Sequence, residues 1–142
     1  MSDTLQHATT VDIGGRGVMI RGASGSGKTS LALALMERGA TLVADDYTQL
    51  RVENDRIIAT APDTIKGKIE VRGYGLIDTT HQDQTAVSLI VDIVPHENVP
   101  RLPDSTTDEI CKIVIPRLLL GVHDAAASGK IKAVLKSLQA KV

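Results

Sequence analysis

The sequence predicts a single α/β domain over residues 1–142, in which a mixed β-sheet with flanking helices carries a phosphate-binding loop. The first observation is segment 22–29, which matches the pattern G-x-x-x-x-G-K-[ST] at every fixed position. The second is that short β-prone runs separated by turn signals make up most of the chain, whereas only two stretches have helical patterns. The third is a hydrophobic content of 42%, which is enough to fill one core.

Composition excludes several classes of protein. The net charge is −1, so we expect no nucleic-acid binding and no attraction to an anionic membrane. No apolar run reaches the roughly 20 residues of a membrane span, and residues 1–10 lack the apolar centre of a signal peptide. Cys111 is the single cysteine, lies in an apolar run and is expected to be buried. These features predict a cytoplasmic protein with no disulfide.

The N-terminal elements lead into the loop. Residues 7–13 and 17–21 are β-prone and flank Gly14-Gly15, which predicts a β-hairpin. Residues 30–38 follow the loop and read as a helix, and Gly39 stands at the position where helices commonly end. A strand, a glycine-rich loop and a helix in this order are typical of a site for a nucleoside triphosphate.

The loop residues themselves have the chemistry that a phosphate chain requires. Its glycines let consecutive backbone N–H groups point at phosphate oxygens, and the helix N-terminus adds partial positive charge. Lys28 can reach the β and γ phosphates, and the Thr29 hydroxyl can ligate Mg²⁺. We therefore predict ATP with Mg²⁺ as the ligand. The residues predicted to hold the nucleotide are Gly22, Ala23, Ser24, Gly25, Ser26, Gly27, Lys28 and Thr29.

Within residues 40–47, an apolar strand ends in two carboxylates, Asp45 and Asp46. In open α/β sheets, ligands bind at the carboxyl ends of strands. One aspartate would accept the proton of an attacking hydroxyl, and the other would hold Mg²⁺ or its waters. The pattern alone leaves open which aspartate has which role.

The middle of the chain reads as β-structure. Residues 49–52 and 57–60 flank an Asn-Asp turn and predict a second hairpin. Residues 62–68 read as a loop. Glu70 and Arg72 would share one face of an extended segment, where they would either serve Mg²⁺ and phosphate or form an exposed ion pair.

The C-terminal part has the clearest buried strand, over residues 85–94. Residues 95–107 contain three prolines and predict an exposed loop, and residues 110–115 predict a strand that ends at Pro116. A last helix is expected from about Asp124 to about Ala140. Its apolar face consists of Ile131, Val134, Leu135 and Leu138.

Three stretches together resemble the catalytic domain of HPr kinase/phosphorylase, a bacterial family that phosphorylates a serine of the phosphocarrier protein HPr. They are the loop 22–29, the Leu-Val-Ala-Asp-Asp run at 42–46, and residues 69–78, which fit the signature [LI]-E-[VI]-R-G-x-G-[LI]-I-[ND]. The signature is the most specific of the three, and the resemblance spans roughly residues 7–116. It implies an architecture related to phosphoenolpyruvate carboxykinase and a homo-oligomer, specifically a hexamer.

The resemblance also implies roles for individual residues. It assigns catalytic roles to His7, Lys28, Asp46 and Arg101, and Mg²⁺ ligation to Thr29 and Glu70. In this scheme Asp46 accepts the proton during phosphorylation and donates it in the reverse reaction. Arg101 lies in a loop whose length varies within the family.

The resemblance has two departures. The chain corresponds to the catalytic part, without the separate N-terminal domain of full-length members. Where the family has a basic Pro-Val-[RK]-Pro-Gly-Arg loop linked to phosphorolysis, residues 116–121 read Pro-Arg-Leu-Leu-Leu-Gly, which leaves only a weak reverse activity open. The predicted function is ATP- and Mg²⁺-dependent phosphorylation of a serine in an HPr-like carrier. The alternatives are a non-catalytic ATP-binding regulator and a small-molecule kinase or carboxykinase-like enzyme, the latter disfavoured by the 69–78 signature.

Overall fold

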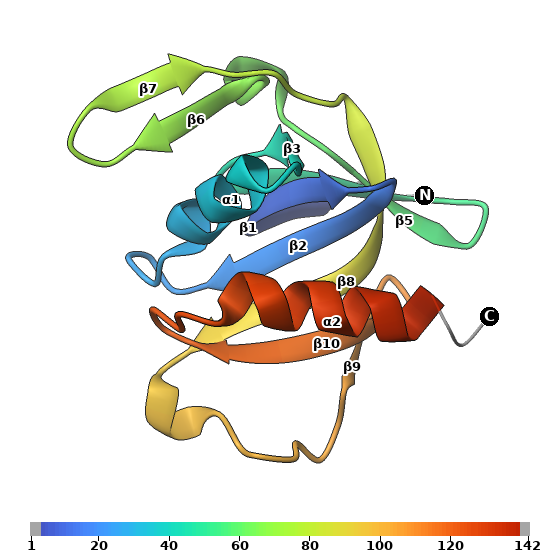
Figure 1. The fold of residues 1–142 in the computed structure, drawn as a ribbon. Helices are drawn as coiled ribbons and strands as arrows, with labels where there is room; N and C mark the ends of the chain where they lie inside the picture. The colour runs from blue at the N-terminus through green and yellow to red at the C-terminus, as the bar shows by residue number, and fades with distance from the viewer. Residues whose placement is uncertain (1–3, 140–142) are drawn as a thin grey trace.

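An eight-stranded mixed sheet with two helices packed against one face forms the body of the molecule (Figure 1). The computed structural model describes residues 4–139. The strands are β1 (Thr4–Ile13), β2 (Arg16–Gly22), β3 (Thr41–Ala44), β4 (Tyr47–Glu53), β5 (Arg56–Thr60), β6 (Lys68–Val71), β7 (Gly75–Asp78), β8 (Gln84–Val94), β9 (Thr107–Ile110) and β10 (Ile113–Gly121). The helices are α1 (Lys28–Glu37) and α2 (Ala127–Gln139), with short 3₁₀ turns at Asp63–Ile65 and His96–Asn98. Neither helix is long and apolar enough to cross a membrane, as far as the described residues go.

The sheet curves back on itself, because β8 is long enough to pair with two distant strands. Its first residues pair with β5 and its later ones with β2, which closes a circuit through β1, β2, β8, β5 and β4. β2, β8 and β10 are parallel neighbours, and β3 runs the same way because both β2 and β3 pair antiparallel with β1. The carboxyl ends of these four strands therefore lie at one edge, where ligands bind in α/β sheets.

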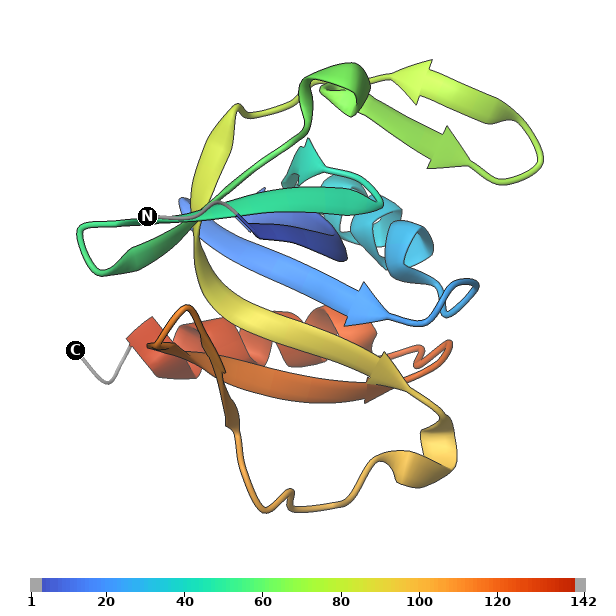
Figure 2. The same ribbon diagram turned by 180° about the vertical axis from the view of Figure 1, so that it is seen from behind.

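Two apolar clusters occupy the two faces of the sheet. Residues alternate between them along the strands: Val18 and Ile20 of β2 face the helices, whereas Met19 between them faces the other side. The predicted apolar face of the last helix is confirmed, because Ile131 and Leu135 are fully buried against this sheet. Figure 2 shows the sheet from the face that the helices leave uncovered.

A network of ion pairs joins four strands at one side of the sheet. Arg21 of β2 donates from Nε to Asp92 of β8 at 2.7 Å and from a terminal nitrogen to Asp108 of β9 at 2.7 Å. Arg117 of β10 also donates to Asp92. Burial raises the pKa of Asp92, but the hydrogen bonds from the two guanidinium groups outweigh this effect and leave that pKa below its ordinary value.

Most elements predicted from the sequence are confirmed. The first hairpin, the helix after the loop, the strand before the two aspartates and the buried strand near residue 90 are all present. The second hairpin turns at Asn54 and Asp55, which have φ of 52° and 61° as a tight two-residue turn requires. The last helix begins at Ala127, after Asp124 accepts a hydrogen bond from the backbone of Ala126, and Ala140 lies outside the described residues.

The prediction of one strand at residues 110–115 is wrong. Cys111 and Lys112 have φ of 50° and 67° and form the turn of a hairpin between β9 and β10. Cys111 is consequently exposed, contrary to expectation. β10 also continues past Pro116. The strand pairs with antiparallel β9 up to Pro116 and with parallel β8 from Arg117 on, so the N–H that proline lacks falls where the partner changes and interrupts neither ladder.

Candidate active site

The phosphate loop lies at the sheet edge where β2 ends and α1 begins. β1 runs antiparallel to β2 and pairs Ala8 with Arg21, so His7 lies beside the start of the loop. β3 ends at the same edge and delivers Asp45 and Asp46. The β6–β7 hairpin, which projects at the top of Figure 1, brings Glu70 to the site from the side.

A hollow of about 420 Å³ opens at this edge, and most of the predicted site residues line it. It brings together His7, Lys28, Thr29, Asp46 and Glu70. Lys28 and Thr29 begin α1, whereas the other three come from β1, the end of β3 and β6. Arg72 and His123 line it as well. The charged side chains of the hollow are balanced in sign, because the cationic Lys28 and Arg72 face it together with the carboxylates of Asp46 and Glu70. A site with both signs of charge suits a phosphate chain that is bound together with a cation.

The loop has the backbone of a phosphate cradle. Gly25 and Gly27 have φ of 80° and 101°, a region that only glycine enters without strain, and these residues turn the loop before α1 starts. Lys28 is 7% exposed, and its Nζ donates to the carbonyls of Gly22 at 2.9 Å and Ala23 at 3.2 Å. Neutral carbonyls compensate the positive charge of a buried ammonium group only in part, so an anionic ligand would be favoured beside Lys28.

Asp45 binds three donors and is not available for proton transfer. Its Oδ1 accepts from the Thr29 hydroxyl at 2.8 Å and the Thr9 hydroxyl at 3.1 Å, and its Oδ2 accepts from the Glu70 backbone N–H at 3.0 Å. The residue is 6% exposed. Asp45 therefore fixes the loop, β1 and β6 relative to one another.

Asp46 is the accessible carboxylate of the pair. Its side chain is 60% exposed, and its Oδ1 accepts a hydrogen bond from Nε2 of His7 at 2.9 Å. A φ of 67° at Asp46, with its backbone N–H bonded to the Thr9 hydroxyl, turns the chain so that the two aspartates point differently. The ring of Tyr47 stacks on that of His7 at 5.1 Å between centroids and helps to orient the imidazole. The geometry favours Asp46 over Asp45 as a proton acceptor.

Thr29 and Glu70 suit a magnesium ion that phosphate oxygens and water also coordinate, rather than a metal ion that is held by protein side chains alone. Across residues 4–139, no three His, Cys, Asp or Glu side chains converge on one point. The Thr29 hydroxyl gives its proton to Asp45, which leaves its oxygen lone pairs free, and the exposed Glu70 carboxylate lines the same hollow. Mg²⁺ in phosphoryl-transfer sites commonly takes one or two protein ligands together with phosphate oxygens and water.

Arg101 lies away from this group. It is exposed and lines a different hollow of about 420 Å³, together with Arg117 and Lys130. Its catalytic role stays a prediction that the described geometry does not support.

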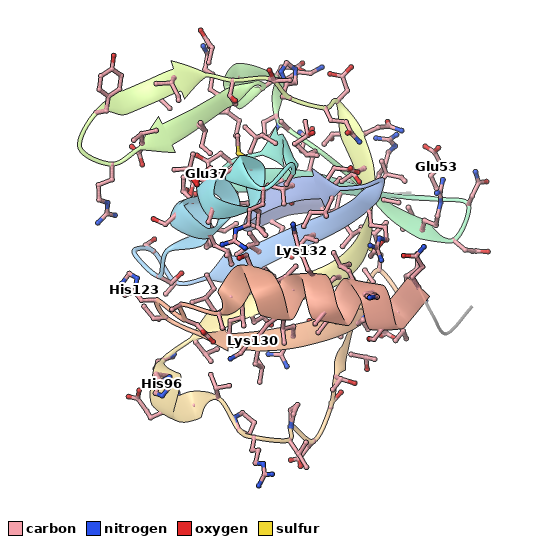
Figure 3. All side chains as sticks on the ribbon, in the orientation of Figure 1. Glu37, Glu53, His96, His123, Lys130 and Lys132 are labelled. Carbon is pink, nitrogen blue, oxygen red and sulfur yellow. The ribbon has the colours of Figure 1, made fainter. Side chains whose placement is uncertain are left out.

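His123 lines the hollow but was not predicted from the sequence. It follows the carboxyl end of β10, at the same edge as the loop, and Figure 3 labels it at the phosphate-loop end of the molecule. A polar residue directly after an apolar parallel strand would have indicated this position. His123 did not fit that pattern in the sequence, because the strand was expected to end at Pro116, seven residues earlier.

Comparisons with known proteins identify the family of this chain and agree with its fold. The family model described as HPr Serine kinase C-terminal domain matches residues 1–138. A solved structure, described as the Hpr(Ser) kinase/phosphatase from Coxiella burnetii, is 30% identical, with a TM-score of 0.84 over 98% of this chain and 99% of that one.

Curated relatives carry a related name. The HPr kinase/phosphorylase of Lactobacillus acidophilus is 34% identical over 128 residues, which cover 82% of this chain and 40% of that protein. That of Geobacillus thermodenitrificans is 36% identical over 132 residues, which cover 84% of this chain and 43% of that protein. The chain thus spans about two fifths of the length of these relatives.

Proposed function

The chain belongs to the HPr Serine kinase C-terminal domain family, and from this premise we propose that it transfers the γ-phosphoryl group of ATP to a serine of an HPr-like phosphocarrier protein. The observation that carries the proposal is one hollow that contains both the loop lysine, Lys28, and an accessible carboxylate, Asp46, paired with His7. A cation for the phosphates and a base for the hydroxyl are the two groups that such a transfer requires.

The loop would hold the triphosphate. Lys28 and the backbone N–H groups at the start of α1 face negative charge that moves from the γ-phosphoryl group toward the β-phosphate during transfer. Because these groups are fixed by the fold, they stabilise that charge without reorganising. Mg²⁺ bound through Thr29 and Glu70 would supply further positive charge to the phosphate oxygens.

Asp46 would act on the incoming serine. As the serine oxygen forms its bond to the γ-phosphorus and the bond from phosphorus to the β-phosphate oxygen breaks, the hydroxyl proton moves to the Asp46 carboxylate. A carboxylate only accepts hydrogen bonds, so Nε2 of His7 carries the hydrogen in their 2.9 Å contact. His7 therefore orients Asp46 and keeps one of its oxygens occupied, which leaves the other for the serine.

The reverse phosphorolysis is proposed to be weak. Residues 116–121 form part of strand β10 instead of a basic loop, and the Arg117 guanidinium already binds Asp92. Inorganic phosphate would find few donors there. Protein given phosphoserine-HPr and excess phosphate should release pyrophosphate slowly, and rapid release would contradict this part of the proposal.

The assembly and location extend the same proposal. The family resemblance supports a homo-oligomer, a hexamer, and a cytoplasmic site of action where HPr-like carriers would be available. Analytical ultracentrifugation of the full chain is the direct test of the hexamer, and a monomer at micromolar concentration would contradict it.

The experiment that tests the function is a single-turnover assay with protein in excess over γ-labelled ATP. Its arms contain Mg²⁺ or a chelator, and either HPr or an HPr variant whose phosphorylatable serine is alanine. We expect acid-stable label on HPr only with Mg²⁺ and only with the serine present. ATP binding without any transfer would overturn the proposal and favour a non-catalytic ATP-binding regulator.

A further inference from the structure

The hollow that Arg101 lines, of about 420 Å³, lies between the 95–107 loop, strand β10 and helix α2. In Figure 1 this loop runs below β10, and α2 lies in front of the strand. This loop–helix hollow is lined by residues between 99 and 106, by residues 116–119 and by residues between 130 and 138. Among the described residues, none lines both this hollow and the one at the phosphate loop. Its volume falls within the range of about 300 to 1,000 Å³ that is usual for small-molecule sites.

Much of the lining is apolar and only half buried. Leu118 and Val134 pack against the core cluster on the helix side of the sheet, whereas Leu119 and Leu138 belong to neither core cluster. All four keep part of their surface exposed. Apolar surface in a hollow favours a ligand with an apolar body, because their contact removes that surface from water.

Every charged side chain that lines the loop–helix hollow is cationic. The three are Arg101 of the loop, Arg117 of β10 and Lys130 of α2, and no Asp or Glu within residues 4–139 lines it with them. Arg117 pairs with Asp92 and Lys130 with Asp124, whereas none of the ion pairs between described residues includes Arg101. The hollow therefore has an excess of positive charge, which favours an anionic ligand.

The arginines also have donor groups to spare. Arg117 donates to Asp92 from Nε, and its terminal nitrogens have no hydrogen-bond partner in the described part of the chain. Its side chain is 30% exposed, so a ligand in the hollow can reach it. A guanidinium presents its N–H groups as a planar fork that matches a carboxylate or a phosphate.

One backbone edge of β10 is open beside this hollow. β9 pairs with that edge only up to Pro116, and β8 pairs with the opposite edge from Arg117 on. The Arg117 N–H still donates to the Thr106 carbonyl at 2.7 Å. Since alternate residues of a strand point their N–H groups to the same edge, the Leu119 N–H faces the side where no described strand continues the sheet. An open edge of this kind offers a backbone donor to a ligand oxygen.

We propose that the loop–helix hollow binds a small organic acid, which has one anionic group on a compact apolar body. The anionic group accepts hydrogen bonds from Arg101, Arg117 and the Leu119 N–H. The apolar body packs on Val134 and Leu138 of α2. Binding here is independent of the proposed phosphoryl transfer, because the two hollows share no described lining residue.

The test uses octanoate as the probe and octan-1-ol as its uncharged match, without nucleotide. A titration of ¹⁵N-labelled protein, followed by amide chemical shifts in NMR spectra, gives both the Kd and the location of each ligand. We expect octanoate to shift the amide signals of residues 99–106, 117–119 and 130–138. We expect its Kd to be about tenfold lower than that of octan-1-ol, which corresponds to one charge-assisted hydrogen bond.

Two further ligands define the anion. Octyl phosphate in place of octanoate shows which anionic group the hollow prefers, and binding of either one above octan-1-ol supports the site. Vesicles of phosphatidylglycerol present the same combination of anion and apolar chain at a lipid surface. Because the hollow is concave, we expect the free acids to bind and the vesicles not to sediment with the protein; the reverse result would overturn the proposal in favour of a membrane surface.

The first pair of variants tests the charge. Arg101→Gln removes the cation that has no ion pair, so octanoate should bind about tenfold more weakly while octan-1-ol is unaffected. Lys132→Gln is the matched control, because this lysine of α2 is exposed, carries the same charge and does not line the hollow (Figure 3). It should change neither Kd.

The second pair tests the cavity. Ser137 is an exposed residue of α2 that lines the hollow, and Ser137→Leu adds apolar bulk to it at a position where leucine is a good helix former. Both ligands should then bind about tenfold more weakly, the usual effect of steric misfit in an apolar pocket. Ala133→Leu on the same helix is the control, since Ala133 is exposed and does not line the hollow.

The outcomes separate this site from the proposed function. Equal Kd values for octanoate and octan-1-ol, or shifts confined to other parts of the chain, would overturn the site. So would octanoate binding that neither Arg101→Gln nor Ser137→Leu weakens; if one of these variants fails to fold, the other decides. Octanoate binding that responds to the variants supports the site even if no phosphoryl transfer to HPr is detected, because the titration contains no ATP.

Discussion

Replacement of Asp45 by asparagine tests whether this buried carboxylate holds the site together. Asp45 accepts hydrogen bonds from Thr29, Thr9 and the Glu70 backbone, and at 6% exposure its side chain has little contact with water that could replace them. An asparagine amide has one acceptor oxygen, and its second group is an NH₂ donor. The donors on one of the two carboxylate oxygens therefore lose their acceptor, and all three donors lose the negative charge that they face. A buried donor left unpaired costs about 1–3 kcal/mol, so we expect the free energy of unfolding to fall by roughly 2 kcal/mol.

Urea denaturation followed by circular dichroism is a suitable assay. With a slope of about 1–3 kcal/mol per molar urea, a loss of roughly 2 kcal/mol lowers the unfolding midpoint by about 1 M. Asp46→Asn is the matched control, because Asp46 is 60% exposed and its ion pair with His7 is worth at most about 1 kcal/mol. Equal midpoints for Asp45→Asn and Asp46→Asn would refute the assignment of Asp45 as the acceptor that joins these elements.

Three further predictions concern the loop lysine, the metal and acid stability. Lys28→Ala should abolish transfer in a folded protein, because the γ-phosphoryl group loses its cationic partner, and a normal transfer rate would exclude the loop as the ATP site. Glu70→Gln should raise the Mg²⁺ concentration at half-maximal ATP binding, since an amide is a poorer ligand for this ion; an unchanged midpoint would make Glu70 a surface residue. Arg21 and Arg117 outweigh burial and lower the pKa of Asp92 in the folded protein. The ionised Asp92 therefore contributes its full stabilisation above the pKa of an unfolded aspartate, about 4. That stabilisation is lost as the pH falls through the lower pKa of the folded state. Unfolding free energy should therefore decrease with acid below about pH 4 in the wild-type protein and less steeply in Asp92→Asn, and identical slopes would contradict this account.

The sequence predicted the features that depend on local chemistry. The phosphate loop, the Asn54-Asp55 turn and the strand before Asp45 follow from glycine positions, turn residues and apolar runs, and each is present in the structure. Such signals need only a few neighbouring residues to specify a backbone conformation.

Features that depend on distant partners were not predicted from patterns alone. His7 and Asp46 are 39 positions apart, and only the family resemblance placed both in one site. Pro116 lacks a backbone N–H and was expected to end a strand, but the change of partner from β9 to β8 makes that N–H unnecessary. The error at Pro116 also concealed His123, because a residue's place at the sheet edge depends on where its strand ends.

The central claim is that Asp46 is the base of a phosphoryl transfer from ATP that the loop binds. The most direct measurement compares wild-type and Asp46→Asn protein in two assays, the Kd of ATP with Mg²⁺ and the single-turnover rate of phosphoserine formation on HPr. We predict that the Kd stays within about twofold while the transfer rate falls by about 10² to 10⁴, the usual contribution of acid–base catalysis. Transfer at an undiminished rate in Asp46→Asn, or no transfer by the wild-type protein when it has bound ATP, would contradict the claim.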